Sequence, residues 1–120
     1  MRILVIDDNE EFRDSLVLFL KEREHEVCWA ATGHSGLRLT VSEKPDLVIL
    51  DINLPDILGY EVARQLPRGL PLIIMSAMGP DKIRHDAIAF QNSIAGALLI
   101  LGKPLDELQM EDALLRIAKS

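Results

Sequence analysis

Several features that mark particular protein classes are scarce in this sequence. Cys28 is the only cysteine, so no internal disulfide can form and a reducing compartment is the natural setting. No apolar run is long enough to cross a bilayer, and no signal-peptide pattern precedes the strand-like run that follows Met1. Basic residues are outnumbered, with 13 Lys and Arg against 19 Asp and Glu, which argues against a face that grips nucleic acid. We therefore expect a cytoplasmic domain with no membrane contact and no direct nucleic-acid binding.

What the sequence does contain is a regular alternation of short apolar runs with amphipathic stretches. Its 120 residues, 48% apolar and 27% charged, fit one globular domain with a single core. Short apolar runs of this kind are typical of a parallel sheet that helices cover on both faces. The expected strands cover 3–6, 26–31, 46–50, 71–75 and 97–101, and the expected helices follow Asn9 and cover 33–42, 60–66, 81–90 and 107–119. The pattern predicts an α/β domain built as (βα)5.

Polar side chains follow four of these apolar runs. Asp7 and Asp8 end the first run, Asp51 ends the third, Ser76 ends the fourth, and Lys103 follows the fifth. The carboxyl ends of parallel strands meet at one edge of the sheet, so these side chains are expected to converge on one pocket. Each residue alone is more often a turn residue, a helix cap or a solvated charge, but their coincidence at strand ends favours a site.

The pocket's chemistry follows from its ligand types. Three carboxylates repel one another unless a cation lies among them, and oxygen ligands suit Mg²⁺. Asp7 and Asp8 are expected to bind this ion directly or through water, although either could point away from the pocket. Asp51 is the candidate nucleophile that accepts a phosphoryl group and also a metal ligand, and the backbone carbonyl of Asn53 is a further candidate ligand.

Three other groups are candidates for binding the phosphoryl oxygens. Lys103 can pair with a phosphate as a point charge, and Ser76 offers a hydroxyl. The backbone N–H of Ala77 is expected to act in the same way. The predicted function is therefore the acceptance of a phosphoryl group by Asp51.

Five motifs together resemble the receiver domain of two-component response regulators, the CheY-like domains. They are ILVIDDN (3–9), LVILDINLPDILG (47–59), MSA (75–77), GA (96–97) and KP (103–104). The resemblance implies a flavodoxin-like fold with strand order 2-1-3-4-5 across residues 1–120. It also implies Mg²⁺-dependent phosphotransfer to Asp51 from a phosphohistidine on a sensor histidine kinase or phosphotransfer protein. Such a domain catalyses its own phosphorylation and slow dephosphorylation but acts as a switch.

The sequence departs from the family pattern in three places. Ile100 stands where an aromatic residue normally acts as a rotamer switch, so the usual readout is in question unless Ile100 is simply core. The segment 78–95 is longer than usual, which suggests an altered output surface on the fourth helix, fifth strand and fifth helix. Leu58 stands where a helix-capping residue is common, and Asp56 is expected to take over that cap.

Other residues and functions are weaker candidates. Cys28 and Trp29 are expected to pack, and His25, His34 and His85 are expected to be exposed and without a role. A phosphorylation-independent docking or dimerisation module of the same fold is the alternative function. A haloacid-dehalogenase-type phosphatase would need a second aspartate at the position of Asn53. The chain could stand alone or form the N-terminal part of a longer regulator, and a homodimer is open to it.

Overall fold

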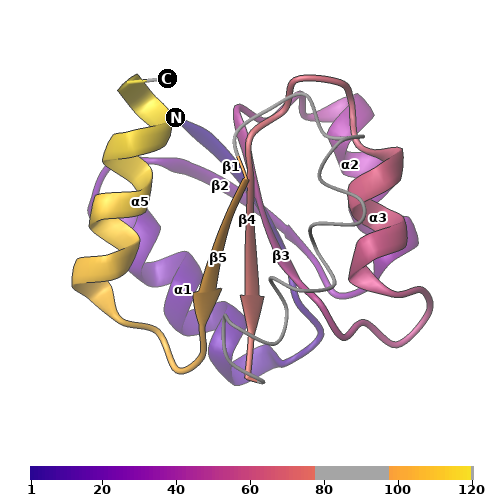
Figure 1. Ribbon diagram of the computed structural model, residues 1–120, viewed down its shortest axis with the longest axis horizontal. Helices are drawn as coiled ribbons and strands as arrows, with labels where there is room; N and C mark the ends of the chain where they lie inside the picture. The colour runs from indigo at the N-terminus through magenta and orange to yellow at the C-terminus, as the bar shows by residue number, and fades with distance from the viewer. Residues whose placement is uncertain (78–97, 120) are drawn as a thin grey trace.

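A computed structural model describes residues 1–77 and 98–119 of the chain (Figure 1). The elements are β1 Arg2–Ile6, α1 Glu10–Glu22, β2 Glu26–Ala30, α2 Gly33–Ser42, β3 Leu47–Asp51, α3 Gly59–Gln65, β4 Leu72–Ser76, β5 Leu98–Gly102 and α5 Glu107–Lys119. The predicted strands are confirmed to within a residue or two. The helix expected over 81–90 and the whole of the long segment 78–95 lie outside the described residues.

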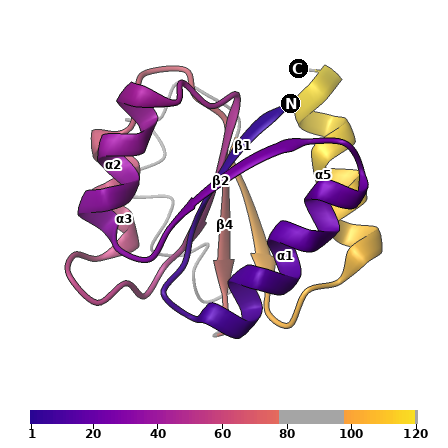
Figure 2. The same cartoon turned by 180° about the vertical axis from the view of Figure 1, so that it is seen from behind.

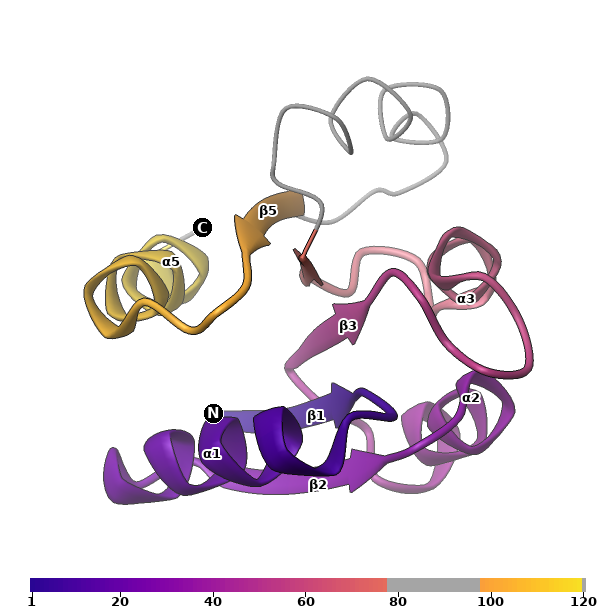
Figure 3. The same cartoon turned by 90° about the horizontal axis from the view of Figure 1, so that it is seen from below.

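The five strands form one parallel sheet in the order β2-β1-β3-β4-β5. This is the flavodoxin-like order that the sequence predicts. Helices α1 and α5 cover one face of the sheet, and α2 and α3 cover the other (Figure 3). None of the helices in the described part of the chain is long and apolar enough to cross a membrane.

Burial explains why the strands are almost wholly apolar. Every residue of β3 and β4 is buried, because helices cover both faces of these central strands. The α1/α5 face takes Ile3, Val5, Leu47, Ile49, Ile73 and Met75 from the sheet, and the α2/α3 face takes Leu4, Ile6, Val48, Leu50, Leu72 and Ile74. Since side chains alternate along a strand, Asp7 and Asp51 continue the first series, on the α1/α5 face.

Helix caps set where the helices begin. The Asn9 side chain accepts a hydrogen bond from the N–H of Phe12 at 2.9 Å, which caps α1. Leu58 precedes α3 and makes no side-chain cap, as expected. The expectation that Asp56 would replace it is wrong.

The Asp56 carboxylate instead adds to the cap of α2 from the loop after β3, beside the N-cap residue Thr32. It accepts hydrogen bonds from the N–H groups of Gly33 at 2.8 Å and His34 at 2.9 Å. Burial alone would raise the pKa of Asp56, but these bonds, with others from nearby backbone N–H groups, lower it to about 2. The loop that follows β3 is thereby tied to the start of α2.

The expectations for the minor residues were partly right. Cys28 is partly buried and packs against the α2/α3 cluster, while Trp29 is 49% exposed with its ring beside α1. The side chain of His34 is exposed, as predicted. His25 is less exposed than expected: the residue is partly buried, and its Nδ1 lies 3.1 Å from the N-terminal amine. His85 lies outside the described residues.

Candidate functional site

The carboxylates of Asp7, Asp8 and Asp51 come together at the carboxyl ends of β1 and β3. One oxygen from each lies within 4.8 Å of the other two, which is a spacing that a single cation can bridge. Asp7 and Asp51 are buried, and Asp8 is exposed. The structure therefore brings together the three predicted carboxylates, and Asp8 contributes to the cluster.

Asp7 is held by contacts to most of its polar atoms. Its N–H donates to the carbonyl of Ala30 at 3.0 Å, and its own carbonyl accepts from Nη1 of Arg13 at 3.3 Å. Its Oδ1 accepts from the N–H of Asn9 at 2.9 Å. Its Oδ2 faces Nζ of Lys103 at 2.9 Å. Oδ2 is consequently the Asp7 oxygen that faces the ammonium group of Lys103.

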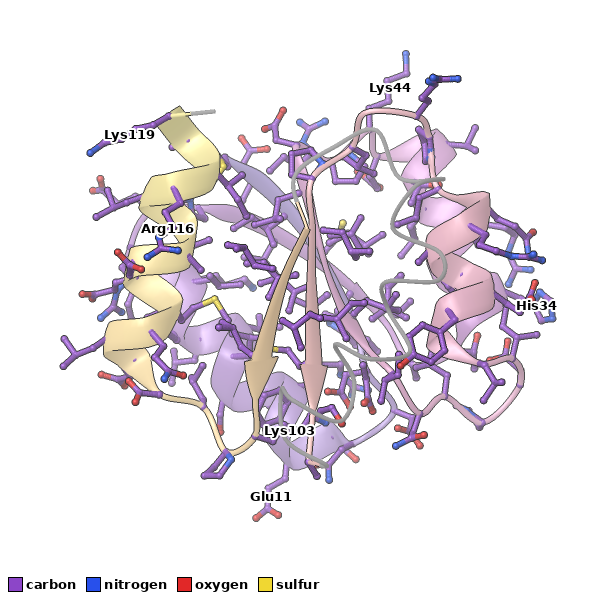
Figure 4. The ribbon with its side chains drawn as sticks, viewed as in Figure 1. Glu11, His34, Lys44, Lys103, Arg116 and Lys119 are labelled. Atoms are coloured by element: carbon purple, nitrogen blue, oxygen red, sulfur yellow. The ribbon has the colours of Figure 1, made fainter. Side chains whose placement is uncertain are left out.

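Lys103 reaches the acidic cluster from the end of β5, where Figure 4 places it at the carboxyl ends of β4 and β5. Its Nζ lies 3.5 Å from Oδ2 of Asp51 as well as contacting Asp7, and only 15% of its side chain is exposed. The Phe12 ring on α1 lies 4.3 Å from Nζ, an arrangement that favours a cation. The Lys103 N–H donates to the carbonyl of Ser76 at 2.8 Å, which ties the lysine to β4.

The electrostatics of Asp51 reflect its crowded surroundings. Burial, the largest cause, and the negative charge of Asp7 raise the pKa of Asp51 to about 6, against the opposing pull of Lys103. The N–H of Asn53 donates to Oδ1 of Asp51 at 3.2 Å and favours the ionised form. Asp51 is therefore mostly ionised at neutral pH, and a bound cation would stabilise that state further.

The remaining predicted residues lie where the topology puts them. Ser76 is fully buried as the last residue of β4, and Ala77 follows it on the surface. Ile100 is partly buried and packs against the α2/α3 cluster, which supports the interpretation of this residue as core. The ligand roles of Ser76, Ala77 and the Asn53 carbonyl stay predictions.

Comparison with known proteins assigns the family. Residues 3–115 match the response regulator receiver domain. The chain is a member of that family. Receiver domains are signalling domains rather than enzymes in the usual sense, so the phosphatase alternative loses its support. An acidic cluster such as Asp7, Asp8 and Asp51 is typical of the magnesium-binding sites of receiver domains.

Curated relatives of this receiver domain are longer proteins. The transcriptional regulatory protein AfsQ1 of Streptomyces coelicolor is 41% identical over 81 residues, which cover 66% of this chain and 36% of AfsQ1. The cell cycle response regulator CtrA of Brucella ovis is 37% identical over 89 residues, covering 70% of this chain and 38% of CtrA. The chain thus matches little more than a third of the length of these relatives.

Solved structures agree with the fold of the receiver domain. A response regulator from Chloroflexus aurantiacus superimposes with a TM-score of 0.86 at 27% identity, covering 99% of this chain and 98% of that one. The receiver domain of the sensor histidine kinase PA1611 from Pseudomonas aeruginosa has a TM-score of 0.84 at 23% identity, covering 99% and 98%. That structure carries a magnesium ion coordinated in its active-site cleft.

Sequence reasoning missed the roles of three side chains, two of which contact residues of the pocket. The role of Arg13 was not predicted, because a charged residue on an amphipathic helix is usually solvated, whereas this side chain is buried. Phe12 lies on α1, where an apolar side chain usually belongs to the core, yet its ring also faces Lys103. Asp56 was assigned to the wrong helix, because its partners are far away in the sequence. The one available signal was the position of Arg13 one turn after Asn9, close to the predicted site.

Proposed function

We propose that this receiver domain is a phosphorylation-dependent switch in which Asp51 accepts a phosphoryl group from a phosphohistidine. The observation that carries the proposal is the cluster of Asp7, Asp8 and Asp51 with Lys103 in contact with two of its members. A cluster of three carboxylates, two of them buried, is costly by itself, so its presence beside Lys103 favours a role that recruits a cation.

The chemistry divides among the residues of the pocket. A carboxylate oxygen of Asp51 attacks the phosphorus, the phosphorus–nitrogen bond breaks, and the leaving imidazole nitrogen keeps the electron pair and takes up a proton. The carboxylates of Asp7, Asp8 and Asp51, with the carbonyl of Asn53, would hold Mg²⁺, which supplies positive charge against the phosphoryl oxygens when bound.

The groups opposite the carboxylates are proposed to bind the transferred phosphoryl group. Lys103 pairs with one phosphoryl oxygen, and its contact with the Phe12 ring helps to hold the ammonium group at the mouth of the pocket. The Ser76 hydroxyl and the Ala77 N–H bind other phosphoryl oxygens. Because the pKa of Asp51 is raised to about 6 in the metal-free form, protonation of this carboxylate below that pH should oppose both Mg²⁺ binding and phosphoryl transfer.

The partners follow from the same proposal. The donor is a sensor histidine kinase or a phosphotransfer protein in the cytoplasm. The effector is an attached domain or a separate protein that contacts β5, α5 and the segment between β4 and β5 for which the sequence predicts the fourth helix, with a homodimer as one form of that contact. Residues 1–120 act as one receiver domain.

Phosphate labelling tests the proposal directly. Incubation with acetyl phosphate or a phosphorylated kinase should label the wild type in the presence of Mg²⁺, and chelation should prevent labelling. Asp51→Asn should abolish it, whereas Asp112→Asn, which changes an exposed carboxylate on α5, should leave it intact. Equal labelling of the Asp51→Asn variant would place the acceptor elsewhere.

The docking module is the second candidate, favoured by one observation. Ile100 packs on the core and offers no aromatic ring that could change rotamer with phosphorylation. A titration with beryllofluoride and Mg²⁺, followed by NMR, separates the two functions. A Mg²⁺-dependent change in the spectrum supports the switch, and its absence supports constitutive docking.

A further inference from the structure

Arg13 is a charged side chain buried beside the acidic cluster. Only 8% of its side chain is exposed, so its guanidinium group has lost most of its water. Nη1 donates to the carbonyl of Asp7, while Nε has no hydrogen-bond partner in the described part of the chain. The carboxylate of Asp14 lies 3.8 Å from Nε, beyond hydrogen-bonding distance. A buried guanidinium with so few partners is costly to keep in place.

Trp29 compensates part of that cost. Helix α1 runs beside β2 (Figure 2), and the Arg13 guanidinium carbon lies 3.9 Å from the centroid of the Trp29 ring. Stacking on an indole face suits a planar, weakly hydrated guanidinium better than an ammonium group. The ring therefore fixes the plane of the guanidinium, and the guanidinium in turn reaches the end of β1.

The contact with β1 falls on the backbone of a proposed metal ligand. The Asp7 N–H, carbonyl and Oδ1 are all held by hydrogen bonds to α1, β2 and the residue that caps α1, while Oδ2 faces Nζ of Lys103 within the acidic cluster. Of these contacts, the hydrogen bond to the Asp7 carbonyl is the one made by a side chain of α1, the guanidinium of Arg13. Groups that orient a ligand without touching the ion commonly control metal affinity.

We propose that Arg13 is a positioning residue for divalent-cation binding at Asp7, and that Trp29 holds its guanidinium in the orientation this requires. The inference rests on the proposed function, because it takes Asp7 to be a metal ligand. It assigns to α1 a role in the pocket beyond covering the sheet.

The sign of the effect distinguishes positioning from simple charge. A positive group near the cluster repels a divalent cation, so if Arg13 acted only through its charge, its removal would strengthen Mg²⁺ binding. If Arg13 positions Asp7, its removal weakens Mg²⁺ binding despite the lost repulsion. Arg13→Met removes the charge and the hydrogen bond together, while Arg13→Lys keeps the charge and loses the planar fork.

Mg²⁺ titration of the purified chain by NMR or calorimetry is the test. We expect Arg13→Met to weaken Mg²⁺ binding by about tenfold, at the lower end of what lost ligand orientation costs. Arg13→Lys should fall between this variant and the wild type, and Trp29→Leu should shift binding in the same direction. The emission of Trp29, the single tryptophan, should respond to Mg²⁺ in the wild type and respond less in Arg13→Met.

Arg23, the C-cap residue of α1, provides a matched control at the other end of the same helix. Its guanidinium carbon lies 3.6 Å from the centroid of the Phe19 ring, and it pairs with Glu111, away from the acidic cluster. Arg23→Met should lower the free energy of unfolding in urea without changing Mg²⁺ affinity. If Arg13→Met fails to fold, Arg13→Lys and Trp29→Leu carry the same comparison.

The outcomes separate this inference from the proposed function. Unchanged or tighter Mg²⁺ binding in folded Arg13 variants, with binding lost in Asp51→Asn, would overturn the positioning role alone. Equal weakening by Arg13→Met and Arg23→Met would show a general loss of stability and also overturn it. If the wild type bound no Mg²⁺, both the inference and the proposed function would fail.

Discussion

Replacing Asp51 by asparagine should stabilise the metal-free protein. The side chain is buried next to the carboxylate of Asp7, and Lys103 offsets only part of the resulting penalty. Asparagine has nearly the same shape and keeps an oxygen that can accept the hydrogen bond from the N–H of Asn53. The substitution removes a charge that the folded state disfavours, so folding should become more favourable.

The size and pH dependence of the effect follow from the pKa of Asp51. Its rise from 3.8 to about 6 on folding corresponds to about 3 kcal/mol. Below the unfolded value of 3.8 the carboxyl is protonated in both states, and no penalty exists. Between 3.8 and about 6 the unfolded chain releases its proton first, so stability falls as pH rises. Above that range the full penalty remains.

Urea unfolding followed by circular dichroism in a chelating buffer measures the effect. At about pH 7.5 the Asp51→Asn variant should be more stable by about 2–3 kcal/mol, and the gap should close toward about pH 4. Mg²⁺ at about 100 times its dissociation constant should add about 2.7 kcal/mol to the wild type and much less to the variant. Asp112→Asn, on the exposed surface of α5, should change stability by less than about 1 kcal/mol at either pH. A variant no more stable than the wild type in the chelating buffer, or a gap that persists at about pH 4, would refute the reasoning.

Three further predictions concern the loop between β3 and α3. Asp56→Ala should lower the free energy of unfolding in urea by about 1 kcal/mol at neutral pH. In the wild type, the stability that Asp56 contributes should be lost as pH falls from about 4 through its lowered pKa of about 2. Equal stability of wild type and variant at neutral pH would contradict a capping role for Asp56. Leu58→Ser should gain about 1 kcal/mol, because α3 begins without a side-chain cap; the same unfolding curves test it, and a loss would contradict it. Gly59→Ala would place a Cβ 2.7 Å from Cα of Ile52 and 2.8 Å from the Asp51 carbonyl oxygen, so we expect a cost of about 1–3 kcal/mol and weaker Mg²⁺ binding by calorimetry. Gly69→Ala is the control for Mg²⁺ affinity, because it strains a backbone with a φ of +85° while no described residue other than the chain neighbours lies within 4 Å of the added Cβ.

The strands and the acidic cluster were predictable because their signals are local. Continuous apolar runs such as that of β3 mark strands buried on both faces, and the residue that ends each run is placed by the topology. Asp7, Asp51 and Lys103 therefore meet as the strand-end rule requires, although they are far apart in the sequence.

The features that the sequence did not predict depend on contacts between distant segments. Nothing local shows that Asp56 caps α2 rather than α3, because the choice depends on how the loop after β3 packs against Gly33. The burial of Arg13 on α1 likewise depends on Trp29, which lies on β2. His25 was expected to be exposed, but it folds against the N-terminal amine, a partner that composition cannot reveal.

The alternation of side chains along the strands gives the pocket something like a reading frame. Asp7 and Asp51 lie on the α1/α5 face because each stands an even number of residues after core positions such as Val5 and Ile49. Deleting one residue inside β3 would leave the strand apolar, yet it would turn every later side chain over and send Asp51 toward α2 and α3. A deletion of two residues would preserve the frame and shorten the strand. The motif around Asp51 thus places the carboxylate in the pocket only when the alternation along β3 is kept, whereas insertions in the connecting segments leave that alternation intact.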